Sequence, residues 1–280
     1  MIDKIKKALP YNISKITKTD MGLTNDNYLL EIDNDSYILR YPLKDVSSLF
    51  NSNQEAEVLE KIKGLDFTLP IKYYKDGIQL VKFEKDLKTF DDYQGENKIK
   101  AVADLMTKFQ ESNLSVSFTF DPLKQIMLYK KHTKNIKINL DDYSDLFERL
   151  KNHKFTPKLC HNDWVAGNIC FINNKTYLID YEYAGNNDPL FDVMSFLTEN
   201  DLSNKERVEF LAYMFKDGIS EKDYQTLIMY RDINNILWYL WAEMMYEFRG
   251  EAIYAEIADI KLSQLKSEYN TKLWTENDIA

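Results

Sequence analysis

The sequence predicts an α+β protein of two lobes, a small N-terminal lobe rich in strands and a larger, mostly helical C-terminal lobe. A length of 280 residues suffices for two lobes with a cleft between them. Up to residue 84, short runs rich in β-branched and aromatic residues alternate with turn residues, as is typical of strands. Beyond residue 97, most segments have the apolar spacing of helices. We therefore expect a strand-rich lobe over residues 1–84, a connector over 85–96 and a helical lobe over 97–280.

The strands expected in the small lobe come in pairs joined by turns. The runs DNYLLEI (26–32) and DSYILRYP (35–42) meet at the hairpin signal DNDS. The stretch TLPIKYYKDGIQLVKF (68–83) has the pattern of two further strands around KDG. Between these pairs, SNQEAEVLEKIKG (52–64) has a capping residue, a helical apolar spacing and a closing glycine, which predicts one helix. The stretch EKDLKTFDDYQGEN that follows is charged and without a period, which suits a connector.

The helices expected in the large lobe show apolar stripes. In NKIKAVADLMTKFQESN (97–113), apolar residues recur at helical spacing from Ile99 to Phe109. Further helices are expected in segments 120–132, 141–153, 207–218, 223–248 and 251–269.

The composition favours a folded protein that binds neither nucleic acid nor structural metal. The formal net charge of -9 and the pI of about 5.0 differ from the basic footprint of nucleic-acid binders. The two cysteines form neither a disulfide framework nor a zinc-binding spacing. The N-terminal stretch MIDKIKKALPYNISK lacks the apolar run of a signal peptide. No stretch approaches the ~20 apolar residues of a membrane span, so we expect a cytoplasmic protein without one.

The segment 158–185, KLCHNDWVAGNICFINNKTYLIDYEYAG, collects polar residues beside apolar runs. NICFI and TYLID have the pattern of two short strands joined by NNK, a tight hairpin. This hairpin would bring Asn168 close to Asp180, and Asp163 lies five residues before Asn168. Three oxygen-bearing side chains that converge repel one another unless cations lie among them. Hard divalent ions such as Mg²⁺ take oxygen ligands and normally bring phosphates with them.

The spacing of these residues resembles that of known kinases. A His, one residue, an Asp and then an Asn five positions later is the catalytic-loop pattern of protein kinases, where a metal-binding Asp follows on the next hairpin. HND…GN…LIDYEYAG, continued by NDPLFD, resembles more closely the aminoglycoside phosphotransferase and choline kinase group. Within that group it is most similar to choline/ethanolamine kinases of the bacterial type. The resemblance covers roughly residues 15–270 and implies a protein-kinase-like two-lobe fold that uses ATP and Mg²⁺.

The resemblance implies a role for each matching residue. Asp163 would orient and deprotonate the substrate hydroxyl, while Asn168 and Asp180 would hold Mg²⁺ against the ATP phosphates. His161 would be structural, and Asp192 would accept backbone hydrogen bonds that fix the catalytic loop. Phosphoryl transfer requires in-line positioning and charge neutralisation more than covalent chemistry.

The resemblance also implies nucleotide contacts in the small lobe. The turn MGLTNDNYLL has one glycine instead of G-x-G-x-x-G, but a GLTN turn is typical of choline kinases, and Thr24 and Asn25 would contact phosphates unless this is a plain hairpin turn. Arg40 stands where protein kinases have a phosphate-binding Lys, and its fork of donors suits phosphate oxygens. Its carboxylate partner is expected to be Glu55, with Glu57 as the alternative. The backbone expected to meet adenine, by analogy alone, is that of Lys82, Phe83 and Glu84.

A tryptophan pair points to the phosphate acceptor. Trp238 and Trp241 are three residues apart and share a helix face. A quaternary ammonium has no N–H donor, so aromatic faces recognise it, at about 0.5–2 kcal/mol per ring. Choline kinases have a similar Trp-x-x-Trp pair followed by a Tyr on the next helix, which Tyr254 matches, and Glu182 and Tyr183 would complete the box. Without the upstream motif, such a pair is more often part of a hydrophobic core.

The function expected from the sequence is therefore phosphorylation of choline to phosphocholine by Mg-ATP. Ethanolamine, thiamine or an aminoglycoside are alternative acceptors, and a non-catalytic protein that binds choline or a nucleotide is the alternative from another class. The sequence does not indicate the oligomeric state, the nucleotide preference or the ranking of choline over ethanolamine.

Overall fold

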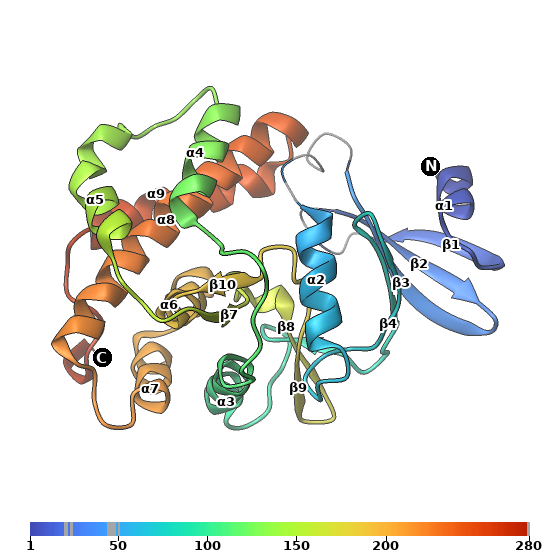
Figure 1. Ribbon diagram of the computed structural model, residues 1–280, viewed down its shortest axis with the longest axis horizontal. Coiled ribbons are helices and arrows are strands. Elements are labelled where there is room, and N and C mark those ends of the chain that lie inside the picture. The colour runs from blue at the N-terminus through green and yellow to red at the C-terminus, as the bar shows by residue number, and fades with distance from the viewer. Residues whose placement is uncertain (20–21, 23–24, 44–48, 50, 279–280) are drawn as a thin grey trace. The chain divides into compact units, whose positions relative to one another are not determined.

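The computed structural model describes residues 1–19, 22, 25–43, 49 and 51–278, and it divides into two compact units. One unit comprises Met1–Lys98 and Ala166–Ala184, and the other comprises Ile99–Val165 and Gly185–Ala280. The first is built around antiparallel sheets and the second mostly of helices, which confirms the predicted α+β class (Figure 1). The segment 166–184 belongs to the strand-rich unit, although in sequence it lies inside the expected helical lobe.

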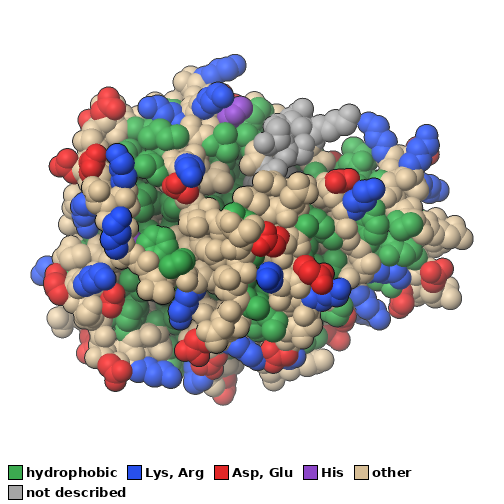
Figure 2. Space-filling model, viewed as in Figure 1, with side chains coloured by type: hydrophobic (Ala, Val, Ile, Leu, Met, Phe, Trp, Pro, Cys, Tyr) green, Lys and Arg blue, Asp and Glu red, His purple; other side chains and the backbone are tan. Residues whose placement is uncertain are grey.

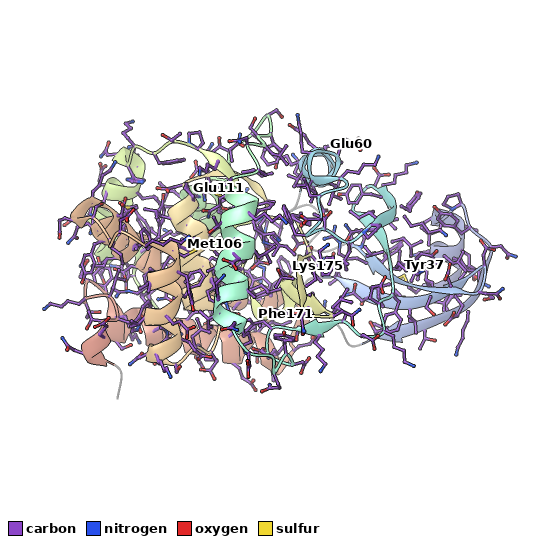
Figure 3. All side chains as sticks on the ribbon, turned by 90° about the horizontal axis from the view of Figure 1, so that it is seen from below. Tyr37, Glu60, Met106, Glu111, Phe171 and Lys175 are labelled. Carbon is purple, nitrogen blue, oxygen red and sulfur yellow. The ribbon has the colours of Figure 1, made fainter. Side chains whose placement is uncertain are left out.

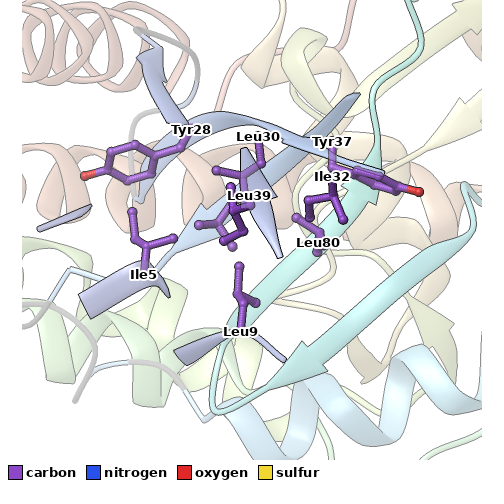
Figure 4. Packing of buried hydrophobic residues seen from close by; sticks show 9 residues of the cluster. Ile5, Leu9, Tyr28, Leu30, Ile32, Tyr37, Leu39 and Leu80 are labelled. Atoms are coloured by element: carbon purple, nitrogen blue, oxygen red, sulfur yellow. The ribbon is translucent and has the colours of Figure 1, made fainter. Parts of the chain in front are cut away.

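The first unit contains a sheet with the strand order β1-β2-β3-β5-β4, in which all neighbours are antiparallel. Its strands are β1 (Ile13–Thr19), β2 (Asp26–Ile32), β3 (Asp35–Tyr41), β4 (Ile71–Lys75) and β5 (Ile78–Lys82). Alternate residues of β2 are buried, as the two-residue period of a strand requires. Figure 4 shows these side chains packed with Leu39 and Leu80 against Ile5 and Leu9, from and just after helix α1 (Ile2–Ala8).

Helix α2 (Ser52–Ile62) carries one side chain of the candidate site. Asn51 caps it, because its side chain accepts hydrogen bonds from the backbone N–H groups of Asn53 and Gln54. The buried positions Glu55, Val58, Leu59 and Ile62 recur at helical spacing. A carboxylate therefore occupies a position on the otherwise apolar buried face of this helix.

A second, smaller sheet in the first unit consists of β6 (Lys88–Thr89), β8 (Ile169–Ile172) and β9 (Lys175–Leu178). The predicted hairpin is confirmed: β8 pairs with β9 so that Ile169 faces Leu178 and Ile172 faces Lys175. Asn173 and Asn174 have φ of 49° and 62° in the turn, a left-handed conformation that Asn tolerates well. Phe171 and Lys175 mark the two strands in Figure 3. The N–H of Leu178 donates to the carbonyl of Phe67 at 2.9 Å, which ties the hairpin to the rest of its unit.

The second unit surrounds one long helix with shorter ones. Its helices are α3 (Lys98–Gln110), α4 (Pro122–His132), α5 (Ser144–Asn152), α6 (Pro189–Glu199), α7 (Asn204–Met214), α8 (Glu221–Arg249) and α9 (Ala252–Glu268). Helix α8 packs against α9, α6 and α4 (Figure 1). Every residue from 226 to 245 is buried. It ends at Gly250, whose φ of 69° is the left-handed conformation that glycine adopts without strain. Two short strands, β7 (Lys158–Cys160) and β10 (Gly185–Asn187), form an antiparallel pair in this unit.

The surface carries charges of both signs. On the face drawn in Figure 2, acidic and basic side chains are interspersed. Within the ranges that the structure describes, no helix has the length and apolarity that crossing a bilayer requires.

Candidate functional site

The β8–β9 hairpin brings Asn168 and Asp180 to one end of the first unit's smaller sheet. Asn168 directly precedes β8, and its carbonyl accepts a hydrogen bond from the N–H of Ile179 at 3.0 Å. Asp180 follows Ile179 with a φ of 62°, and about 31% of its side chain is exposed. A left-handed conformation outside glycine costs of order 1 kcal/mol or more and tends to occur where function requires it. Here it directs a carboxylate away from the strand.

An arginine collects three carboxylates in the same unit. Arg40 of β3 donates from Nη2 to the carboxylate of Glu55 and from Nη1 to Oδ1 of Asp180. Its Nη1 also lies 3.9 Å from Oε2 of Glu182, which accepts a hydrogen bond from Nδ2 of Asn25 at 3.2 Å. The ion-pair partner expected on α2 is therefore Glu55, and Glu57 is not needed for this role.

This cluster holds two more negative charges than positive ones, since three carboxylates face one guanidinium. Burial lowers the pKa of Arg40, but the carboxylates of Glu55 and Asp180 outweigh it, so that the pKa is raised overall. Burial raises the pKa of Glu55. Arg40 and the hydroxyl of Tyr74, which donates to Oε2 of Glu55 at 2.8 Å, act in the opposite direction. The guanidinium stays charged, and the surplus of negative charge favours a further cation.

The donor atoms fit a magnesium ion that is bound together with phosphates. The amide oxygen of Asn168 and the carboxylate of Asp180 are hard oxygen ligands, and Mg²⁺ takes one or two such protein ligands beside water and phosphate oxygens. Among the residues that the structure describes, no three His, Cys, Asp or Glu side chains are grouped so as to hold a metal by themselves. The set therefore suits an ion that arrives with its substrate better than a permanently bound structural metal.

The expected phosphate turn is described in part. Thr24 lies outside the described residues. Gly22 has a φ of 78°, and a Cβ atom there would lie 2.4 Å from Nδ2 of Asn27, so this position requires glycine. A hollow of about 60 Å³ lies beside the turn, and its lining includes Asn25, Arg40 and Glu182.

The expected adenine-binding stretch is partly engaged in the sheet. Lys82 ends β5 and lies opposite Tyr37 of β3. The N–H of Phe83 donates to the carbonyl of Ser36 at 2.9 Å, and the carbonyl of Glu84 accepts from the N–H of Leu87 at 3.2 Å. Contact between this backbone and adenine stays a prediction, and it would have to use other groups or the second lone pair of a carbonyl.

In the second unit, a buried aspartate holds the loop that contains Asp163. The carboxylate of Asp192, on α6, accepts hydrogen bonds from the N–H groups of His161 at 3.0 Å and Asn162 at 2.7 Å. This confirms the role predicted for Asp192. Burial raises its pKa to about 6, while hydrogen bonds from Trp164, Asn162 and His161 act in the opposite direction. Asn162 itself has a φ of 65°.

Two further residues of the α6 segment hold this loop and were not identified from the sequence. The hydroxyl of Ser195 accepts from the N–H of Trp164 at 3.0 Å, and Nδ2 of Asn200 donates to the carbonyl of Trp164 at 2.8 Å. The sequence did contain a signal for them, because Ser195 and Asn200 are polar residues in an otherwise mostly apolar helical segment. Trp164 is completely buried and lies 6.0 Å from the ring of His161, so both pack beneath the loop. The backbone is thus fixed on both sides of Asp163.

Three aromatic rings meet on α8 and α9. Trp238 and Trp241 lie edge to face with ring centroids 6.0 Å apart, and Trp241 lies in the same way 5.8 Å from Tyr254. We call these residues the aromatic triad. Trp238 is 5% exposed and Trp241 7%, whereas Tyr254 is completely buried. Burial raises the pKa of Tyr254 to about 12, so its phenol is neutral at physiological pH.

Comparison with known proteins finds similarity to phosphotransferases. The model of the phosphotransferase enzyme family matches residues 117–229. Protein LicA of Haemophilus influenzae is 27% identical over 245 residues, which are 81% of this chain and 72% of that protein. Over these residues the chain is similar to the phosphotransferase enzyme family, and over most of its length it is similar to LicA.

Solved structures confirm the kinase-like fold of this chain. The choline kinase LicA of Streptococcus pneumoniae has a TM-score of 0.78 at 24% identity, covering 95% of this chain and 97% of that one. A LicA structure in complex with AMP has a TM-score of 0.79 at 22% identity, covering 95% of this chain and 96% of that one.

The residues predicted for the site fall into two groups in the structure. The first unit holds Asn25, Arg40, Glu55, Lys82, Phe83, Glu84, Asn168, Asp180, Glu182 and Tyr183, and the second holds Asp163, Trp238, Trp241 and Tyr254. Glu182, expected in the substrate box, lies beside Arg40, and Tyr183 is buried. That Asp163 meets Asn168 and Asp180 around one substrate stays a prediction.

Proposed function

We propose that this protein transfers the γ-phosphoryl group of ATP to the hydroxyl of choline and yields phosphocholine and ADP. The match of residues 117–229 to the phosphotransferase enzyme family supports phosphoryl transfer, and the similar structure from Streptococcus pneumoniae is a choline kinase. The LicA complex with AMP supports an adenine nucleotide as the donor. The observation that carries the choice of acceptor is the aromatic triad in the second unit.

The triad matches the chemistry of a quaternary ammonium group. The trimethylammonium group of choline donates no conventional hydrogen bond, so its positive charge is recognised by ring faces and by negative charge. Each ring contributes about 0.5–2 kcal/mol, and the larger values apply where water is excluded. Trp238, Trp241 and Tyr254 are all buried, and neutral Tyr254 adds a third ring without a charge.

In the proposed mechanism, Asp163 accepts the proton of the choline hydroxyl as its oxygen attacks the γ-phosphorus. General-base catalysis contributes about 10²–10⁴-fold only when the base is held in place. The hydrogen bonds from His161 and Asn162 to Asp192 and from Trp164 to Ser195 provide this rigidity, because they fix the backbone on both sides of the base.

The polar cluster of the first unit would bind the triphosphate. Asn168 and Asp180 would hold Mg²⁺, which neutralises phosphate charge when it is bound. Arg40 stays charged and presents a planar fork of donors, so it would pair with phosphate oxygens. Because Nη1 of Arg40 already contacts Asp180, the same arginine keeps that carboxylate in position.

The experiment is a panel of acceptors with Mg-ATP, read by ADP release and by mass detection of the phosphorylated product. We expect choline to have the highest kcat/KM, and thiamine and an aminoglycoside to give none above background. Asp163→Asn should keep ATP binding and lose about 10²–10⁴-fold in kcat. A wild-type protein that releases no ADP with any acceptor contradicts the proposal, and so does an Asp163→Asn variant with unchanged kcat.

A further inference from the structure

Two asparagines on α8, the helix that carries Trp238 and Trp241, are completely buried and lack hydrogen-bond partners for most of their polar atoms. Asn234 and Asn235 have no exposed surface. Nδ2 of Asn234 donates to the carbonyl of Tyr230 at 3.0 Å. Oδ1 of Asn234 and both amide atoms of Asn235 have no partner among the described residues, and the same is true of Nε1 of Trp241.

The helix places these amides on the face that carries the two indoles. Asn234 lies four residues before Trp238 and seven before Trp241, and Asn235 lies three before Trp238. Residues at these spacings share one face of an α-helix. Long side chains in a helix lean toward its N-terminus, so we expect the indole of Trp238 to lie over the turn that bears both asparagines. The opposite face carries apolar residues such as Ile236 and Leu240.

Two other buried polar residues on the same helix, Arg231 and Asp232, have hydrogen-bond partners. Arg231, three residues before Asn234, donates to the backbone carbonyls of Glu268 and Lys272, and Asp232 accepts from the N–H of Asn270 at 3.2 Å. A buried amide without a partner destabilises the folded state, so native proteins rarely keep one without a reason. The asparagines therefore differ from the structural polar groups of α8 and point to a polar ligand at the triad.

We propose, on the basis of the function proposed above, that Asn234 and Asn235 determine which amino alcohols this enzyme accepts. Their amide oxygens would accept N–H groups of an ammonium held by the triad, so that a primary ammonium such as that of ethanolamine is a substrate as well as choline. A primary ammonium loses hydration on entering an aromatic site and regains hydrogen bonds only from acceptors. A trimethylammonium group has no N–H, so it gains only dipolar attraction from the same oxygens.

The test compares kcat/KM for choline and ethanolamine in wild-type protein and in Asn235→Leu. Leucine is similar in shape to asparagine and lacks the unpartnered amide, so the melting temperature should stay the same or rise. We expect kcat/KM for ethanolamine to fall about tenfold or more, as for loss of a hydrogen bond to a charged group, and that for choline to change much less. Asn234→Leu is the second variant, with the same expectation. Leu240→Met, a volume-conserving change on the opposite face, should leave the ratio of the two substrates unchanged.

Each result has a distinct meaning. A fall in the ethanolamine-to-choline ratio in either Asn variant supports the proposal. A folded Asn235→Leu and a folded Asn234→Leu that both keep the wild-type ratio overturn it, since asparagines that only hold buried water would alter stability and not specificity. A wild-type enzyme that phosphorylates choline but not ethanolamine also overturns it and leaves the proposed function intact. A wild-type protein inactive on both amines overturns the proposed function itself.

Discussion

Replacing Asp192 by Asn removes a buried charge while keeping the size of the side chain. In the wild-type protein both carboxylate oxygens are used, one by the N–H of His161 and the other by the N–H of Asn162. An asparagine can accept only one of these bonds, and its NH₂ group faces the other N–H. We therefore expect the loop around Asp163 to shift and kcat to fall by about 10²-fold, as for a misplacement of about 1 Å.

The effect of Asp192→Asn on stability depends on pH, and its magnitude follows from burial. The pKa of Asp192 is raised from 3.8 to about 6 by burial. This difference of about 2 pH units corresponds to about 3 kcal/mol, at 1.36 kcal/mol per unit. Because the folded-state pKa is the higher one, the ionised group destabilises the fold above pH 6, and this cost is lost as pH falls toward 4.

At pH 7.5 the variant should therefore be about as stable as the wild type. Removing the buried charge gains about 3 kcal/mol, which offsets the loss of about 1–3 kcal/mol from the disrupted hydrogen bond. Its stability relative to the wild type should then decline by about 3 kcal/mol between pH 7 and pH 4. Denaturant unfolding followed by tryptophan fluorescence measures this, because all four tryptophans, Trp164, Trp238, Trp241 and Trp274, lie in the second unit. Parallel pH curves for the two proteins would refute the burial argument.

Two further predictions concern the ion pair and the aromatic triad. Arg40→Met should destabilise the protein by about 3–5 kcal/mol, because it leaves Glu55 buried without its cation. Adding Glu55→Leu should restore most of this loss. Denaturant unfolding followed by circular dichroism measures both. If Arg40→Met alone were at least as stable as the double variant, this account would be contradicted. Trp241→Leu should raise KM for choline about tenfold and leave KM for ATP within about twofold, measured by ADP release. Equal changes in both constants would instead assign Trp241 to the hydrophobic core.

Features that depend on neighbours in the chain were predictable. The hairpin of residues 168–180 follows from two β-rich runs separated by NNK, and its strand pairing brings Asn168 and Asp180 together without help from distant segments. The shared face of Trp238 and Trp241 follows in the same way from helical periodicity. The resemblance of the HND…GN…LIDYEYAG motif added the kinase-like fold, which similar structures confirm.

Features that depend on packing between distant segments could not be predicted from the sequence. The sequence left Glu55 and Glu57 open as partners of Arg40, and the burial of one face of α2 decided for Glu55. Glu182 was expected in the substrate box, whereas its distance of 3.9 Å from Arg40 depends on how β3 packs near the end of the hairpin.

The sequence by itself determined the local chemistry: which oxygen donors flank one hairpin, and which rings share one helix face. Only the tertiary structure decided which buried polar groups have hydrogen-bond partners. Asp192 accepts hydrogen bonds from two backbone N–H groups, whereas the amide of Asn235 finds no partner within the described part of the chain. The physical reason is that hydrogen-bond partners 30 or more residues apart, such as Asn162 and Asp192, are chosen by packing. Periodicity and spacing act only over a few residues and contain no information on that choice.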